Sequence, residues 1–253
     1  MPLNLYNYYT GPHLVGDNYQ SEIPSVAYQR LRSQVNTGKI DRSYNSEHML
    51  AIRRYKKTIM KDPDTAAEFA YMFQDHHQPL YPNEEKFVAD NATNLKNLID
   101  YMHKFGVNDA MRNRIERDGT ISDRMVYAQR IQRVPLGPEF TEQILSAPVI
   151  NIALYTADFE GEKNKGLSLP ASFIARARER ILTDEQSVGI YMGLAQRHWP
   201  AGEEVLLRSY ANSEESAHIL TWVVQRLAET DADAANDLAN RMQEIDNERA
   251  RNS

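Results

Sequence analysis

Apolar residues recur at intervals of three and four along most of the chain, which is the spacing of amphipathic helices. The clearest run lies between Asn83 and Gly106, at Phe87, Val88, Leu95, Leu98, Ile99, Met102 and Phe105. Asn83, followed by two glutamates, is a helix-start signal, and Gly106 is a typical residue just beyond a helix end. The pattern predicts one amphipathic helix across this stretch.

Start and stop residues divide the rest of the chain into further helices. Three are expected to begin at Pro24, Ser46 and Pro63 and to reach about residues 35, 61 and 77. Others are expected over 107–117, 122–133, 138–147, 170–182, 184–197, 203–229 and 231–250. Residues 149–158 are an apolar run that fits either a short strand or a buried helix. The expected fold is therefore predominantly all-α, a multi-helix bundle with one short β element near 149–158 as the open alternative.

The predicted helix over 203–229 carries an a/d seam, with apolar or small residues at alternating steps of four and three. The seam consists of Leu206, Tyr210, Ser213, Ala217, Leu220, Val224 and Leu227, and Leu238, Met242 and Ile245 repeat the spacing. Such a seam packs helices at shallow angles, either inside one bundle or against another chain.

Residues 1–23 have no helical period, because Gly11-Pro12 and Gly16 interrupt it. This segment contains Tyr6, Tyr8, Tyr9 and Tyr19. Tyrosines bury a large contact area at low entropic cost. We expect an extended aromatic arm that docks on its own domain or on a neighbouring copy. Residues 24–133 would follow as an N-terminal helical region and residues 139–253 as a C-terminal one, in one or two domains.

The composition of the chain excludes several kinds of site and several classes of protein. There are no cysteines, which excludes disulfides, thiolate zinc sites and cysteine nucleophiles. No apolar stretch approaches the roughly 20 residues that span a bilayer, and the first residues do not resemble a signal peptide. We expect a cytoplasmic or virion protein that is not secreted and has no membrane partner.

Charge is distributed in blocks although the net charge is only −6. Residues 29–61 carry nine lysines and arginines against two acids, and residues 62–100 carry two against eight. On a helical wheel, one stripe of the predicted helix 46–61 contains Arg53, Arg54, Lys57 and Lys61, with Tyr28 and Tyr44 available for stacking. The stripe is a solvated face, or it binds an acidic protein surface such as another copy, or it binds nucleic acid. An acidic pI of about 5.7 is unusual for a nucleic-acid binder.

Two short patterns resemble metal-binding motifs. Glu215 and His218 have the Glu-x-x-His spacing of carboxylate-bridged di-iron bundles, but no second such pair occurs, and the wheel places both away from the seam. Asp75-His76-His77 falls in a predicted helix without companion aspartate motifs. Glycine-rich phosphate loops and the serine nucleophile elbow are also missing. The sequence predicts no catalytic residue and no cofactor, and it disfavours an enzyme.

These observations favour a structural or assembly protein of a large homo-oligomer, such as a viral or phage particle subunit, that acts through its arm and its helices. The first alternative is a nucleic-acid-binding helical protein that uses the basic helix 46–61. The second is a helical metal-dependent oxidase built around Glu215 and His218.

Overall fold

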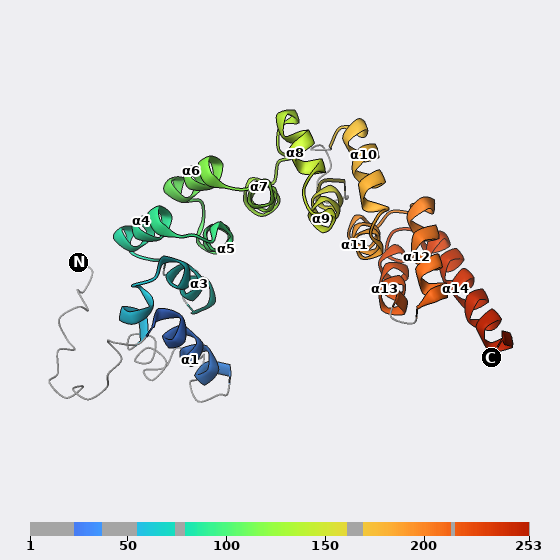
Figure 1. Ribbon diagram of the computed structural model, residues 1–253, viewed down its shortest axis with the longest axis horizontal. Helices are drawn as coiled ribbons and strands as arrows, with labels where there is room; N and C mark the ends of the chain where they lie inside the picture. The colour runs from blue at the N-terminus through green and yellow to red at the C-terminus, as the bar shows by residue number, and fades with distance from the viewer. Residues whose placement is uncertain (1–22, 37–54, 74–78, 161–168, 214–215, 253) are drawn as a thin grey trace. The chain divides into compact units, whose positions relative to one another are not determined.

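Helices account for the regular structure of the residues that a computed structural model describes, which are 23–36, 55–73, 79–160, 169–213 and 216–252 (Figure 1). No strand occurs in these ranges, so the all-α fold is confirmed there. The apolar run at 149–158 lies in helix α9 (Val149–Glu160), and the strand alternative is wrong. Most of α9 is buried, so its apolar residues surround the helix axis instead of forming a stripe with a readable period.

The chain divides into two compact units, residues 1–112 and residues 113–253. The division falls within α6 (Asp109–Asp118). The proline-containing stretch 134–138 therefore belongs to the second unit.

The first unit is organised around α3 (Pro63–Phe73), which packs against α1 (Pro24–Asn36), α4 (Pro82–Asn91) and α5 (Leu95–Phe105). One cluster of buried side chains consists of Ala27, Tyr28, Leu31, Tyr55, Ile59 and Phe69. The predicted apolar stripe of α5 is confirmed, since Leu95, Leu98, Ile99 and Met102 are buried.

The single helix predicted between Asn83 and Gly106 is wrong, because the chain breaks into α4 and α5. Asp64 of α3 explains the break: its carboxylate accepts hydrogen bonds from the Thr93 N–H at 3.0 Å, the Thr93 hydroxyl at 2.6 Å and the Asn94 N–H at 2.9 Å. The Asn94 side chain then caps α5 by accepting from the Lys96 N–H. A carboxylate from another helix thus fixes the turn between α4 and α5.

The second unit is a two-layer stack of helices (Figure 1). It begins with the C-terminal part of α6 and α7 (Ile121–Tyr127), followed by the π-helical turn η3 (Ala128–Gln132) and the 3₁₀ turn η4 (Pro138–Phe140). The remaining helices are α8 (Thr141–Leu145), α9, α10 (Ala171–Ile181), α11 (Glu185–Ala195), α12 (Pro200–Asn212), α13 (Ala217–Leu227) and α14 (Ala232–Asn252). Helix α11 packs between α9 and α13 to form one layer, and α8, α10 and α12 lie in the other.

The single helix predicted over 203–229 is also wrong, because α12 ends at Asn212 and Ser213 has extended backbone angles. The Ser216 hydroxyl donates to Glu185 Oε1 at 3.1 Å and lies 2.8 Å from the Ser209 hydroxyl, which ties the start of α13 to α11 and α12. The seam residues nevertheless share one core: Leu206, Tyr210, Leu220 and Leu227 are all buried. The predicted spacing identified the buried residues but not the corner between the helices.

Within the ranges given above, none of the helices has the length and apolar character needed to cross a lipid bilayer.

Candidate functional site

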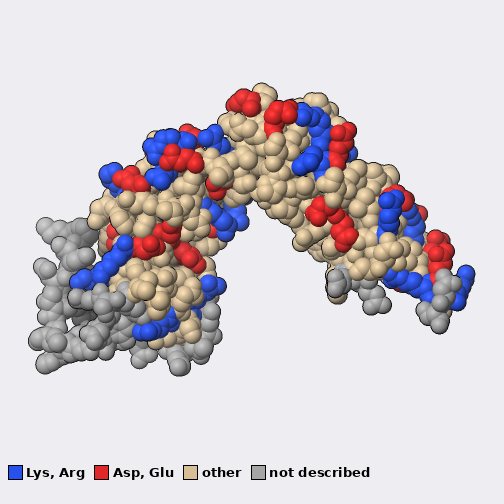
Figure 2. Space-filling model, in the orientation of Figure 1, with Lys and Arg blue, Asp and Glu red and all other residues tan. Residues whose placement is uncertain are grey.

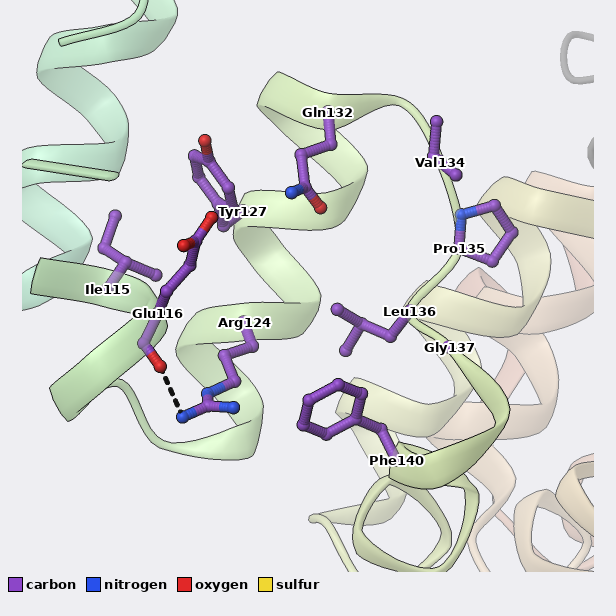
Figure 3. A pocket seen from close by; sticks show the side chains of 10 residues that line it. All are labelled: Ile115, Glu116, Arg124, Tyr127, Gln132, Val134, Pro135, Leu136, Gly137 and Phe140. Atoms are coloured by element: carbon purple, nitrogen blue, oxygen red, sulfur yellow. Dashed lines mark hydrogen bonds between the residues drawn. The ribbon is translucent and has the colours of Figure 1, made fainter. Parts of the chain in front are cut away.

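An open hollow of about 720 Å³ lies in the second unit, between α6, α7 and the segment that carries η4 (Figure 3). Its apolar lining consists of Ile115, Tyr127, Val134, Pro135, Leu136 and Phe140. Its polar lining consists of Glu116, Arg124 and Gln132. The volume is within the range of about 300–1,000 Å³ that is typical of ligand sites, and the mostly apolar lining is typical as well.

Arg124 is the basic residue of this hollow, and its guanidinium group is held in place. Nη2 donates to the backbone oxygen of Glu116 at 2.7 Å, and Nε donates to the backbone oxygen of Gly119 at 3.1 Å. The guanidinium carbon lies 5.3 Å from the centre of the Phe140 ring, which is a cation–π distance. Figure 3 shows Arg124, Leu136 and Phe140 pointing toward one another across the hollow. The site therefore offers a fixed positive charge among apolar walls.

The rim of the hollow is shaped by the π-helical turn η3. The Arg133 N–H donates to the Ala128 oxygen at 2.8 Å, and Arg133 has a φ angle of 57° in the left-handed region. A residue with a side chain rarely takes this conformation, and single π turns are frequent at functional sites. The chain then turns outward, leaving Val134 46% exposed.

Beyond Val134 the rim is anchored again. The Leu136 N–H donates to the Tyr155 hydroxyl of α9 at 2.7 Å, so the chain on this side of the hollow is tied to the core. Burial raises the pKa of Tyr155 to about 12, which keeps this phenol a neutral partner at ordinary pH. The hollow is thus formed by fixed walls.

A second surface feature lies on the layer formed by α9, α11 and α13. Leu154 of α9 is 37% exposed and Leu194 of α11 is 44% exposed. Ile150 of α9, Ile190 of α11 and Trp222 of α13 are partly exposed. We call these five residues the layer face. Figure 2 shows charged side chains of this unit over α8 and α10 and along α14, with a further acidic patch near α11.

The helices under the layer face approach closely because α11 has two glycines. A Cβ atom on Gly189 would overlap with Ile219, and one on Gly193 would overlap with the Trp222 ring. Gly189 and Gly193 are four residues apart and so share one face of α11. This Gly-x-x-x-Gly spacing is a sequence signal for close α11–α13 packing that the helix predictions did not use.

A buried ion network joins α9, α10 and α11 around Glu160. The Glu160 carboxylate accepts from Arg178 Nη2 at 2.6 Å, from the Tyr191 hydroxyl at 2.5 Å and from Arg197 Nη1 at 3.3 Å. Burial, together with the hydrogen bond to Glu160, raises the pKa of Tyr191 far above its ordinary value. Both carboxylate oxygens already have donors, and the network acts as a link between helices.

Glu203 of α12 is a buried carboxylate with incomplete partners. It is 2% exposed, and its Oε1 has no partner with hydrogen-bond geometry, although His198 Nδ1 lies 2.9 Å away. Oε2 lies 3.7 Å from Arg241 Nη1. Burial raises the pKa of Glu203, and the charges of His198 and Arg241 oppose that shift. Sequence reasoning missed this group, because a single glutamate near a helix start has no distinguishing pattern.

Most of the candidate site residues named from the sequence lie outside the described ranges. These are Tyr6, Tyr8, Tyr9, Tyr19, Tyr44, Arg53, Arg54, Asp75, His76, His77 and Glu215. Of the rest, Lys57 and Lys61 are exposed, while Tyr55 and Ile59 are buried on the opposite side. His218 is exposed on α13.

One expectation about stacking residues needs correction. Tyr28 is buried, and its hydroxyl donates to Glu68 at 2.9 Å, so its ring is not available to a nucleotide base. The sequence could not show this, because Tyr28 lies on the face of α1 that packs on α3.

Among the described residues, no group of three or more histidine, aspartate or glutamate side chains is arranged to hold a metal ion. Comparison of the chain with protein-family models, curated proteins and solved structures found no match.

Proposed function

We propose that this chain is a structural protein that assembles with copies of itself through helix surfaces and its tyrosine-rich arm, as the subunit of a large homo-oligomer such as a viral or phage particle. The observation that carries the proposal is the layer face, where exposed Leu154 and Leu194 lie on neighbouring helices of one layer. Single exposed leucines are common on monomeric proteins, but apolar residues on three adjacent helices favour a contact surface.

The energy available from such a contact is sufficient for a reversible association. Covering the exposed parts of Leu154 and Leu194 removes apolar area from water, worth roughly 1–2 kcal/mol each. Ile190 and Trp222 add smaller amounts, because they are already partly buried. Each 1.4 kcal/mol changes a dissociation constant about tenfold. A few such side chains at the centre of an interface therefore decide whether subunits associate.

Charge favours a second copy as the partner. Residues 29–61 carry nine lysines and arginines against two acids, whereas residues 134–253 carry 11 against 19. Regions of opposite sign on one kind of subunit attract each other between copies and raise their association rate. Contacts between an acidic and a basic region also weaken with salt, which gives the proposal a second measurable property.

The test replaces the layer-face leucines, one at a time, by a charged residue in the full chain. We expect Leu154→Asp and Leu194→Asp each to raise the concentration at which oligomers form by tenfold or more, measured by light scattering after size exclusion. Val107→Asp is the matched control, since Val107 is 57% exposed in the first unit. If all three variants and the unmodified chain formed oligomers at the same concentration, the layer face would not be the contact surface between copies.

A further inference from the structure

The hollow beside Arg124 has an apolar lining and a fixed cation, and its Leu136 wall is tied to the core. A ligand for such a site needs apolar or aromatic groups for the walls and no lysine or arginine near Arg124, because like charges repel and an unpaired buried charge is costly. It also needs an electron-rich face or an oxygen near the guanidinium group of Arg124.

One segment of this chain has that composition. Residues 1–16 contain no lysine, arginine, aspartate or glutamate, and residues 1–22 contain Tyr6, Tyr8, Tyr9 and Tyr19. Tyrosine rings stack on guanidinium groups, and their hydroxyls remain able to hydrogen-bond at the rim. An extended segment of 22 residues reaches at most about 75 Å from its attachment before α1, which is long enough to pass from one subunit to another.

We infer that the hollow lined by Arg124, Leu136 and Phe140 is the receptor for the tyrosine-rich segment 1–22 of a neighbouring copy. The inference rests on the proposed function, since it requires copies to associate. It deepens that proposal by naming both sides of a contact that differs from the layer face. A contact between an arm and a separate hollow is heterologous, so repeating it links subunits into rings or open arrays.

The shape of the rim is consistent with this use. Val134 is 46% exposed at the edge of the hollow, where the left-handed Arg133 turns the chain outward. The neighbouring Leu136 is anchored to Tyr155, so an incoming side chain meets a wall that does not have to be ordered first. Preformed walls lower the entropic cost of binding.

The absence of cysteines from the chain makes a direct test possible. One preparation carries Val134→Cys, and a second, with an affinity tag, carries Cys in place of one arm tyrosine, tested in turn at Tyr6, Tyr8, Tyr9 and Tyr19. The two are mixed and oxidised, and the disulfide-linked pair is quantified on a non-reducing gel. We expect at least one arm position to give tenfold more mixed dimer than the same arm variant with Val107→Cys. A synthetic peptide of residues 1–22 should suppress that product, and the peptide with all four tyrosines replaced by serine should not.

The outcomes separate this inference from the proposed function. Light scattering on the same mixture before oxidation reports whether copies associate. Oligomers without a preferred mixed disulfide would overturn the receptor role of the hollow and leave the assembly proposal intact. A third preparation carries Val134→Cys and the arm cysteine in the same chain. A disulfide that forms only within this doubly substituted chain would overturn the inference as well, because the arm would then bind its own subunit. Monomers throughout would overturn both.

Discussion

The ring of Trp222 on α13 occupies the space that a side chain on Gly193 of α11 would need. The two helices can pack this closely only because Gly193 has no Cβ atom. This contact lies under the layer face. Trp222, which packs against Gly193, is itself a partly exposed member of the layer face, and so is Leu194, the next residue after Gly193. The fit between one glycine and one tryptophan therefore sets the spacing of two helices on the proposed contact surface.

The first prediction follows from this fit. Gly193→Ala should force the Trp222 ring to move and lower the free energy of unfolding by about 1–3 kcal/mol, as overpacking of a core does. Denaturant titration followed by tryptophan fluorescence measures the loss. Leu194→Ala, one position along and 44% exposed, is the control and should cost less than about 1 kcal/mol. Equal effects of the two variants would contradict the packing role of Gly193.

The second prediction concerns the turn between α4 and α5. Asp64→Ala removes the acceptor of three hydrogen bonds from Thr93 and Asn94, and we expect it to lower the free energy of unfolding by about 1–3 kcal/mol. Asp90→Ala is the control, because Asp90 forms an exposed ion pair with Lys86 on α4 that is worth at most about 0.5 kcal/mol. Thermal unfolding measured by circular dichroism compares the stabilities of the Asp64→Ala and Asp90→Ala variants. A loss no larger for Asp64→Ala than for Asp90→Ala would show that the turn does not need the carboxylate.

The sequence predicted the helices well where local signals were complete. In α5 the apolar stripe was readable because one face is buried and the other is exposed. The break before α5 was not predicted, since it depends on Asp64, which lies about 30 residues earlier in the chain. The corner at Ser213 was missed for the same reason: the seam spacing continues across it, and the hydroxyl and carboxylate groups that fix it come from three helices.

The candidate sites were less predictable than the fold. Arg124, Leu136 and Phe140 come together because the π-helical turn η3 and the left-handed Arg133 redirect the chain, and neither has a sequence signature. The helix predicted over 122–133 does end before Pro135, because the residue before a proline disfavours helical angles. The sequence around Pro135 gave no indication of a hollow beside it.

A third prediction uses Tyr155, whose pKa burial raises to about 12. The unfolded phenol titrates near 10, so above that pH the unfolded state loses a proton that the folded state retains. Tyr155 therefore contributes stability that is complete below about pH 10 and is lost as the pH rises toward 12. We expect the free energy of unfolding to fall less steeply with pH for Tyr155→Phe than for the unmodified chain over this interval. If the free energy of unfolding fell equally with pH for Tyr155→Phe and for the unmodified chain, the result would contradict a buried, neutral Tyr155.

A fourth prediction concerns Glu203, whose pKa burial raises above its ordinary value. The folded state then keeps a proton that the unfolded state loses, so the contribution of Glu203 is complete at low pH and declines as the pH rises through its folded pKa. Glu203→Gln stays neutral throughout, and we expect its stability relative to the unmodified chain to increase as the pH rises above about 4, where an unfolded glutamate ionises. One proton limits the slope to about 1.4 kcal/mol per pH unit.

The control for this measurement is Glu204→Gln at the next position. The side chain of Glu204 is 60% exposed and pairs with the same Arg241, so the substitution removes a surface charge without changing a buried one. Its stability relative to the unmodified chain should change little with pH. If the stability of Glu203→Gln relative to the unmodified chain also stayed constant with pH, the buried carboxylate of Glu203 would ionise without cost.

The central claim is that copies of this chain associate, and the molar mass of the unmodified protein in solution tests it most directly. Light scattering after size exclusion, over a hundredfold range of protein concentration at low and high salt, gives that mass without a probe. We predict a multiple of the 29.1 kDa chain mass that grows with concentration and declines with salt. A constant mass of 29.1 kDa under all of these conditions would contradict the account.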